Sequence, residues 1–376
     1  MSAALISIVA AASSFVAGPQ RPVAPRVHAP WQRGAASNAL RMLTLDDFLC
    51  EEDGQAELST ILLALTGACK TVASKIATAS CDSTSCFNEI DETDEMLAID
   101  LLAEEVLFDA LTKTGLVETA SSESDGVMRR LTMLPPMDAA DVADGGSGGH
   151  HRDGDAHHDA APPFSVALDP LDASSIIDSN FAVGTIFAVW RAPSFIGKTG
   201  RELVAAGTCT YGPRTAITLA LAARPAVHEF LLIGDRWLQS NVYSSMQPEG
   251  RLFAPGNLRA TASRPGYAEL VDYWQSRKYT LRYTGGLVPD VTQLIVKGKG
   301  VFTSVPEAGE RPRLRLCYEA APMAFLVEKA GGASSDGARS LLDLEITEPL
   351  VRTQVALGSP DEVRRFDEMV GPLDAE

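Results

Sequence analysis

The segment Asp169-Pro170-Leu171-Asp172-Ala173-Ser174-Ser175 places metal-binding and phosphate-binding chemistry side by side. It follows the apolar run of residues 164–168, which predicts a buried strand that ends at Pro170, because proline cannot continue a hydrogen-bonded ladder. The two carboxylates can bind a hard divalent cation, with the Leu171 carbonyl as a further oxygen ligand. The amides and hydroxyls that follow can receive a phosphate. The alternative is an ordinary Asp-Pro turn before a serine-capped helix.

Asp100 has an unusual predicted environment. The apolar pattern predicts a helix from residue 94 to about residue 111, closed by Gly115, on which Asp100 shares a core-facing side with Ala103 and Leu107. A buried carboxylate needs a cation or several hydrogen-bond donors, so Asp100 is a candidate functional residue. Asp94 lies near the start of the same helix, where negative charge is favoured, so a role as a helix cap is enough to explain its position.

Two further acids complete a candidate set. Glu123 lies in a Ser-Ser-Glu-Ser stretch. Glu319 lies between a predicted strand, residues 314–318, and a helix that should begin near Pro322 and end at two glycines. Carboxylates from distant segments that meet at strand ends suit a phosphoryl-transfer site with two or three Mg2+ ions.

Helices alternating with short apolar strands must position these residues, and this alternation predicts an α/β (α+β layered) protein with a sheet covered on its faces. We expect helices over residues 45–79, 94–111, 214–223, 267–277 and 322–330, and strands over residues 164–168, 183–190, 229–233, 293–296 and 314–318. Residues 135–163 are rich in Gly, Asp, Ala and His and predict a flexible surface insertion. Its histidines, His150, His151, His157 and His158, could bind a transition metal or lie solvated in the loop.

The composition is that of an acidic globular protein. With 376 residues and 45% hydrophobic content, the chain can bury a substantial core and form two lobes. The formal net charge is −17, yet no Asp or Glu precedes Asp46, and without the four arginines before that residue the remainder carries about −21. We therefore expect no nucleic-acid and no membrane partner. A phosphorylated substrate must be attracted locally by metal ions, Arg or Lys, and backbone amides.

The acid-free, Ala- and Ser-rich N-terminus predicts a targeting presequence over residues 1–45. A chloroplast transit peptide would explain it. So would the two-part presequence of algae with secondary plastids, whose cleavage motif residues 12–16 resemble. A disordered extension is the remaining alternative. The weakly apolar run of residues 3–16 is too short for a stable membrane span.

Several ordered blocks resemble the fructose-bisphosphatase superfamily, and within it most closely the plastid sedoheptulose-bisphosphatases: KIATASCDSTSC, DEMLAID, DPLDASSIIDSNFAVGTIF, AAGTCTYGPRT, FAPGNLRAT, YTLRYTGGLVPD and YEAAPMAFLVEKAGG. The resemblance runs from about Leu45 to Gly371, interrupted by the insertion. It implies a layered αβαβα sandwich, a homodimer or homotetramer, and Mg2+-dependent hydrolysis of a sugar bisphosphate. Lobes are expected at residues 46–245, which bind metal, and residues 246–376, which bind the sugar phosphate.

Carried over position by position, the resemblance implies metal and catalytic roles. Mg2+ would be bound by Glu123, Asp169, Asp172, Glu319 and the Leu171 carbonyl. Asp94 and Asp100 would orient or deprotonate the attacking water beside Glu123.

The resemblance also implies a substrate site. The phosphate that is removed would be held by Ala173, Ser174 and Ser175, while Asn257, Arg259, Tyr283 and Arg313 would contact the sugar and its second phosphate. Arg282 matches an arginine that, in the family, reaches a neighbouring subunit's site.

Cys81 and Cys86 match the C-x4-C pair that thioredoxin reduces in plastid sedoheptulose-bisphosphatases. The resemblance therefore implies a regulatory disulfide and an enzyme of the chloroplast stroma that acts in the Calvin cycle. A pair of unconnected thiols is the alternative. Plastid fructose-bisphosphatases carry their redox cysteines in an inserted loop, and the insertion here has none, which favours sedoheptulose 1,7-bisphosphate as the substrate.

Three positions depart from the family pattern. Ala173 replaces a usual glycine, Ser124 replaces the second of two consecutive glutamates, and Arg313 replaces a usual lysine. Two hypotheses therefore stand. One is an active sedoheptulose-bisphosphatase with fructose 1,6-bisphosphate as a possible second substrate. The other is a catalytically impaired paralogue that binds sugar phosphates or a plastid partner.

Overall fold

The computed structural model describes residues 43–50, 55–78, 92–132 and 164–373, with only the backbone of residues 92–98. All of these belong to one compact unit, Met42–Glu376. Several predictions fall outside the described residues: most of the presequence, the insertion with its four histidines, Cys81, Cys86 and the side chain of Asp94.

The described residues contain helices α1 (Leu45–Cys50), α2 (Ala56–Thr78), α3 (Glu92–Thr114), α4 (Pro265–Ser276), α5 (Leu287–Lys297), α6 (Ala321–Lys329) and α7 (Pro360–Met369). The strands of the larger sheet are β1 (Val117–Ser122), β2 (Arg129–Arg130), β3 (Phe164–Asp172), β4 (Val183–Trp190), β5 (Leu203–Tyr211), β6 (Ala216–Leu221), β7 (Val227–Ile233) and β8 (Arg236–Tyr243). The remaining strands are β9 (Leu252–Pro255), β10 (Thr280–Leu281), β11 (Val301–Ser304), β12 (Leu314–Arg315), β13 (Ala333–Ser335), β14 (Arg352–Thr353) and β15 (Val355–Gly358).

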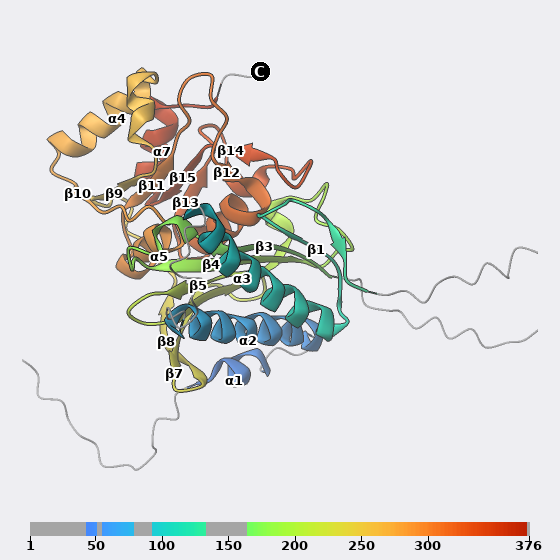
Figure 1. Cartoon of the computed structure of the whole chain (residues 1–376). Coiled ribbons are helices and arrows are strands. Elements are labelled where there is room, and N and C mark those ends of the chain that lie inside the picture. The colour runs from blue at the N-terminus through green and yellow to red at the C-terminus, as the bar shows by residue number, and fades with distance from the viewer. Residues whose placement is uncertain (1–42, 51–54, 79–91, 133–163, 374–376) are drawn as a thin grey trace, which may run out of the picture. The chain divides into compact units, whose positions relative to one another are not determined.

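Two sheets and three helical layers alternate (Figure 1). The first sheet has the order β2-β1-β3-β4-β5-β6-β7-β8, and the second has the order β10-β9-β11-β15-β13. Helices α1, α2 and α3 contact one face of the first sheet, and α5 and α6 contact both sheets. Helix α7 packs on the far face of the second sheet beside α4. This arrangement confirms the predicted αβαβα sandwich.

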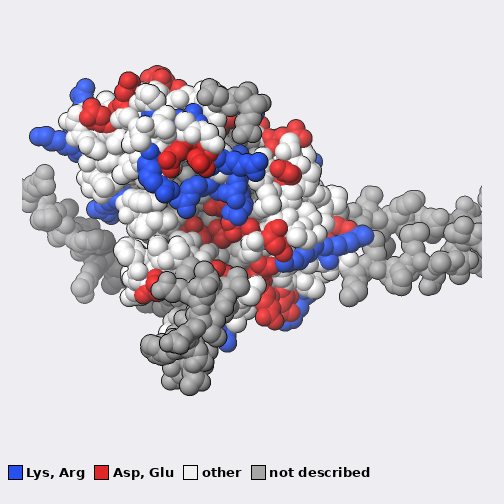
Figure 2. All heavy atoms as spheres, turned by 45° about the horizontal axis from the view of Figure 1, so that its top comes forward, with Lys and Arg blue, Asp and Glu red and all other residues white. Residues whose placement is uncertain are grey.

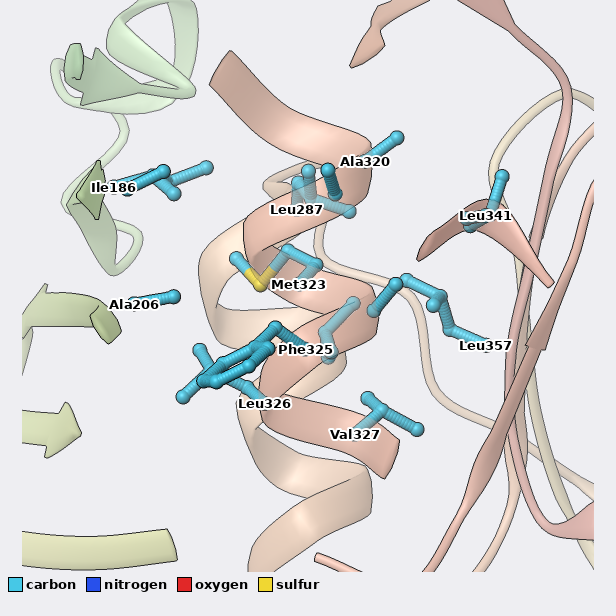
Figure 3. Close-up of a cluster of buried hydrophobic side chains, with 14 of the residues drawn as sticks. Ile186, Ala206, Leu287, Ala320, Met323, Phe325, Leu326, Val327, Leu341 and Leu357 are labelled. Atoms are coloured by element: carbon cyan, nitrogen blue, oxygen red, sulfur yellow. The ribbon is translucent and has the colours of Figure 1, made fainter. Parts of the chain in front are cut away.

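The central helical layer joins the two sheets through one hydrophobic core. Figure 3 shows Met323 and Leu326 on α6 between the strands that carry Ile186 and Ala206 on one side and Leu357 on the other. All five of these side chains are at most 1% exposed. Because α5 and α6 bury apolar side chains in both directions, the two sheets are held in a fixed relation to each other.

Helix α2 is long and apolar enough to cross a membrane by length and composition. Its face from Leu58 to Val72 is instead buried in the core between the outer helices and the first sheet. A buried helix of a globular protein passes the same composition test, so α2 gives only weak evidence for a membrane.

Most predicted elements are present, with shifted ends. The predicted helix over residues 45–79 forms as α1 and α2, and the helix with Asp100 forms as α3, followed by Gly115 at φ 66°. Strands β4 and β7 and helices α4 and α6 confirm four further predictions.

Two element predictions were wrong in kind. Residues 214–223, predicted as a helix from their Ala and Leu content, contain β6, which pairs with β5 and β7 and is buried along its whole length. Tertiary pairing therefore overrides helix propensity. Residues 293–296, predicted as a strand, lie in α5, because the apolar positions Leu287, Val291 and Leu294 continue the pattern at helical spacing.

Two predictions at the site also need correction. Strand β3 does not end at Pro170 but continues to Asp172, because Pro170 falls in an irregularity of the β3–β4 pairing where no amide is needed. The predicted strand over residues 314–318 is reduced to the two residues of β12. The π-helical turn Leu316–Ala320 follows it and runs into α6, so Glu319 lies in a helical turn.

Candidate active site

One cavity of about 390 Å³ brings together residues from both sheets. Its lining includes ten residues that the sequence singled out: Glu123, Asp169, Leu171, Asp172, Ala173, Ser174, Ser175, Tyr283, Arg313 and Glu319. On the face shown in Figure 2, Lys and Arg side chains gather next to Asp and Glu side chains. The predicted metal ligands and the phosphate-binding segment are thus gathered in one place.

The strand arrangement explains why the acids meet. Strands β1 and β3 are parallel neighbours, and Ser122 pairs with Leu168 at the end of their ladder. The next residues, Glu123 and Asp169, therefore lie side by side where the β1–β3 ladder ends, and the Glu123 amide donates to the Leu168 carbonyl at 2.8 Å. Parallel strands place their carboxyl ends at the same edge, where functional side chains commonly gather.

Asp169 and Glu319 are buried acids of the cavity whose pKa values are strongly raised. Burial raises the pKa of Asp169 well above its ordinary value, and the neighbouring Asp172 and Glu319 raise it further. Burial likewise raises the pKa of Glu319 to about 7, although the Arg315 amide donates to it at 2.7 Å. Both groups are at most 8% exposed. The cavity therefore concentrates negative charge that only a cation or a proton can relieve.

Asp172 is held by the start of helix α5. Its carboxylate accepts the Leu287 amide at 3.2 Å and the Val288 amide at 2.7 Å. Burial raises its pKa to about 6, and these two amides act in the opposite direction. The N-terminus of a helix favours negative charge, so α5 stabilises the ionised form of Asp172. Asp172, a residue of the first sheet, is thereby hydrogen-bonded to helix α5, which contacts both sheets.

Arg315 supplies a positive charge inside the acidic cluster. Its guanidinium forms an ion pair with Glu123, and it lies 3.9 Å from a Glu319 oxygen. Burial lowers the pKa of Arg315, and Arg352 beside it acts in the same direction. Arg352 lies opposite Arg315 in the β12–β14 pair and donates to the Arg313 carbonyl. Arg313, Arg315 and Arg352 thus line the same cavity as the carboxylates.

The donor set fits a hard divalent cation. Glu123, Asp169, Asp172 and Glu319 offer only oxygen ligands, and Mg2+ prefers carboxylate and carbonyl oxygens. Burial is the main cause of the raised pKa values of the three acids, and neighbouring carboxylates raise them further. Among the described residues, no three acidic, His or Cys side chains already converge as a finished metal site, and Arg315 pairs with Glu123 instead. An ion that binds through Glu123 would therefore compete with Arg315 for this carboxylate.

The predicted phosphate-binding segment, residues 173–175, forms a tight turn after β3. Ala173 adopts a left-handed conformation with φ 66°, and Ser174 opens the 3-10 turn Ser174–Ile176. Asp100 on α3 approaches this turn: burial raises its pKa to about 6, and the Ser174 side chain acts to lower it. Within the described residues, Oδ1 of Asp100 has no hydrogen-bond partner. An ionisable oxygen is therefore available beside the turn.

Not every predicted substrate residue lies in the cavity wall. Asn257 donates to the Val305 carbonyl at 3.0 Å, while Gly256 beside it lines the cavity. Arg259 is exposed and lies 3.6 Å from Glu307. Arg282 is exposed outside the lining, whereas Tyr283 lines the cavity and donates to the Gly256 carbonyl at 3.1 Å.

Sequence reasoning missed several lining residues, among them Arg315, Arg352, Gly256 and Ser304. Arg315 had a signal, because it stands four residues before Glu319 and two after Arg313. Arg352 had none, because it reaches the cavity only through the long-range pairing of β14 with β12.

Ser124, which stands where the family has a second glutamate, joins a hydroxyl network behind the cavity. The Ser122 hydroxyl lies 3.1 Å from the Ser124 hydroxyl and 3.1 Å from a carboxylate oxygen of Glu104. Glu104 in turn pairs with Arg129. The departure therefore replaces a charge with a small polar side chain that is already hydrogen-bonded.

Comparisons with known proteins agree on the kind of protein. The family models described as "Fructose-1-6-bisphosphatase, N-terminal domain" and "Fructose-1-6-bisphosphatase, C-terminal domain" match residues 155–240 and 246–371. The chloroplastic sedoheptulose-1,7-bisphosphatase of Spinacia oleracea is 45% identical over 325 residues, which cover 86% of this chain and 77% of the spinach protein. The class 1 fructose-1,6-bisphosphatase of Geobacter metallireducens is 36% identical, over 74% of this chain and 80% of that protein.

A solved structure gives the same result. The crystal structure of a Toxoplasma gondii protein assigned as a sedoheptulose-1,7 bisphosphatase superposes with a TM-score of 0.70 and 31% identity. The match covers 87% of this chain and 98% of that one. The similarity therefore includes both sheets and the cavity between them.

The raised pKa values predict an unusual dependence of stability on pH. Asp100 and Asp172, with pKa values of about 6, and Glu319, at about 7, bind protons more tightly in the folded than in the unfolded chain. Their contribution to stability is present below about pH 4 and is lost as the pH rises through 7. In the metal-free protein we expect this loss to lower Tm between pH 5.5 and 8, and Mg2+ to raise Tm more at pH 8 than at pH 5.5.

Asp169→Asn provides the comparison, because it removes one of the repelling charges. Without metal it should be more stable than the wild type at pH 8, and it should gain less from Mg2+. Thermal denaturation at constant ionic strength, with and without Mg2+, measures all of these differences. An equal Mg2+ shift at both pH values, or in both proteins, would contradict the assignment.

Ala173→Gly should stabilise the protein, because Ala173 has φ 66° and glycine adopts that conformation without a steric penalty. We expect the free energy of unfolding to rise by up to about 1 kcal/mol after the greater freedom of glycine in the unfolded chain is counted. Lys278→Gly is the matched control, since Lys278 has φ 60° at the end of α4, outside the cavity lining. Urea denaturation should give a similar gain for both, and a loss for Ala173→Gly alone would show that its methyl group contributes to packing.

Proposed function

Because this chain belongs to the fructose-1,6-bisphosphatase superfamily, we propose that it hydrolyses the 1-phosphate of sedoheptulose 1,7-bisphosphate. The chain is a sugar bisphosphatase, that is, a phosphoric monoester hydrolase. The proposal concerns the substrate, the Mg2+ requirement, the regulation and the place of action. Fructose 1,6-bisphosphate is the alternative or second substrate.

One observation carries the proposal: four carboxylates and three arginines line the same cavity. A dianionic phosphate in this cavity meets Arg313, Arg315 or Arg352 on one side, and cations held by the acids would attract it on the other. The 45% identity to a sedoheptulose-1,7-bisphosphatase, against 36% to a fructose-1,6-bisphosphatase, supports the seven-carbon substrate.

The chain's own residues divide the work of hydrolysis. Mg2+ bound by Glu123, Asp169, Asp172, Glu319 and the Leu171 carbonyl would neutralise charge on the phosphate and acidify water. The Ala173–Ser175 turn orients the phosphate that leaves, through its amides and hydroxyls. Asp100, whose pKa is about 6, is ionised above neutral pH and can accept the proton of the attacking water. Asp94 at the start of α3 would assist it.

The sugar and its second phosphate extend toward the second sheet. Tyr283 and Arg313 line that side of the cavity and would contact them. Asn257 and Arg259, which lie outside the lining, would complete these contacts. Arg282 is exposed, so it is free to reach the site of a second subunit in the homodimer or homotetramer that we propose.

We place the reaction in the chloroplast stroma as part of the Calvin cycle. The spinach relative is named chloroplastic, and the acid-free N-terminus has the composition of a transit peptide. Thioredoxin would act on Cys81 and Cys86, which precede α3 in the sequence. A disulfide there would alter the start of the helix that carries Asp94 and Asp100.

Phosphate release tests the function directly. With Mg2+ and a dithiol, the full chain should release phosphate from sedoheptulose 1,7-bisphosphate faster than from fructose 1,6-bisphosphate. Asp169→Asn should lower kcat at least about a hundredfold, because it removes one of the carboxylates that would bind Mg2+. No release from either substrate at high enzyme concentration would refute an active enzyme and favour the impaired paralogue, and Ser124→Glu would then show whether the missing glutamate is the cause.

The redox proposal has its own test. The wild-type chain should gain activity several-fold on reduction with thioredoxin, whereas a Cys81→Ser, Cys86→Ser variant should be equally active with and without reductant. Cys50→Ser is the matched control, since Cys50 is an exposed cysteine at the end of α1, and it should keep the wild-type response. A response that survives in the double variant would assign the regulation to other cysteines.

A further inference from the structure

Asp290 is a buried carboxylate for which the catalytic residues described above give no role. It lies in the first turn of α5 and is 0% exposed. Its oxygens accept the Thr284 amide at 2.9 and 3.0 Å and the Gly285 amide at 3.2 Å. The Thr284 hydroxyl accepts the Gly286 amide at 3.3 Å. Asp290 therefore holds the turn that leads into its own helix.

The next two amides of this segment go to Asp172, so the five amides of residues 284–288 are all accepted by side-chain oxygens. Asp290, which lies on α5, holds the first amides of the segment. Asp172, which lies on the first sheet, holds the last two. Five consecutive N–H groups that bind side chains leave the segment little freedom to change conformation.

Burying Asp290 is costly. Among the described residues no Lys or Arg forms an ion pair with it, and the side chains that hydrogen-bond to it, Gln293 at 3.4 Å and Thr284, are uncharged. Burial raises the pKa of Asp290, and its charge in turn raises the pKa of Asp172. A buried carboxylate that destabilises the ionised form of a neighbouring carboxylate does little for the stability of the fold. Its presence therefore indicates that the conformation of the segment it holds is needed for function.

The segment is part of the cavity wall. Tyr283, Gly285 and Gly286 line the cavity, and Gly285 has φ 102°, a conformation that favours glycine. A Cβ atom on Gly286 would lie 2.9 Å from that of Ala173, so the segment packs directly on the phosphate-binding turn. A small movement of these residues would change the distance between the sugar side and the phosphate side of the cavity.

We propose that Asp290 is a positioning residue that fixes residues 283–286 as the wall against which the sugar of the bisphosphate is placed. The identity of the ligand rests on the proposed function, whereas the hydrogen bonds that hold the wall do not. Asp290 itself touches no reacting atom and acts through Tyr283 and the two glycines.

Asp290→Asn tests this role, because the amide keeps the size of the side chain but turns one acceptor into a donor that faces backbone N–H groups. We expect KM for the bisphosphate to rise roughly tenfold, with kcat changed much less, because the wall is loosened while the acids and the phosphate turn remain. Thr284→Val, which removes only the hydroxyl, should raise KM in the same direction by a smaller factor. This second variant keeps the test decisive if Asp290→Asn does not fold.

Glu229→Gln is the matched control. Glu229 is also a buried carboxylate, 4% exposed, and its side-chain donors Ser240, Asn241 and Tyr243 are uncharged. It lies outside the cavity lining. This variant should lower Tm without changing KM, which separates loss of stability from loss of positioning.

Hydrogen exchange of the peptide that contains residues 283–288 provides a readout without turnover. Asp290→Asn should exchange these amides faster than the wild type, and Glu229→Gln should not. Unchanged KM in both Asp290→Asn and Thr284→Val would overturn the proposal. If the wild type releases no phosphate, the proposed function fails, and unchanged exchange in Asp290→Asn would separately overturn the positioning role.

Discussion

Repulsion between buried carboxylates is the constraint around which this molecule is organised. Asp169, Asp172 and Glu319 lie in one cavity at most partly open to water, and burial together with mutual repulsion raises their pKa values. The fold compensates locally, with the amides of α5 on Asp172 and the amide and guanidinium of Arg315 near Glu319. What remains is an excess of negative charge in the cavity, and we propose that divalent cations neutralise it and, together with the arginines, attract the phosphate.

The layered architecture makes this concentration of charge possible. The parallel pair β1 and β3 delivers Glu123 and Asp169 to one sheet edge, while the turn before α6 delivers Glu319. Helices α5 and α6 pack on both sheets, so their apolar core fixes the distance between the acidic and basic halves of the cavity (Figure 3). Stability and function therefore depend on the same central layer, since any loosening of that layer would separate charges that must act together.

The sequence identified many of the residues that line the cavity, whereas it misjudged several of the elements that carry them. The residues from Asp169 to Ser175 could be predicted because the possible metal ligands and the possible phosphate turn are contiguous in the sequence. Glu123 and Glu319 were candidates from their places in the sequence, and the family resemblance assigned them to the metal site. The continuation of the strand through Pro170 could not be predicted, because proline is tolerated there only through an irregular pairing with β4. Strand β6 was misjudged for a similar reason: its helix-favouring residues are overruled by two neighbouring strands. Arg352 could not be found at all, since only the β12–β14 pairing brings it to the cavity.

The central claim is that the carboxylates at the end of β1 and β3 and the carboxylate of Glu319 before α6 bind divalent cations together in one cavity. The most direct test is anomalous diffraction from crystals of the reduced chain grown with Mn2+ and a sugar phosphate. Mn2+ binds similar oxygen ligands and scatters anomalously. The account predicts anomalous peaks within ligand distance of Asp169, Asp172, Glu123 and Glu319, with Arg315 turned away from Glu123. Full-occupancy Mn2+ elsewhere, with the Arg315–Glu123 pair intact and the sugar phosphate bound, would contradict it.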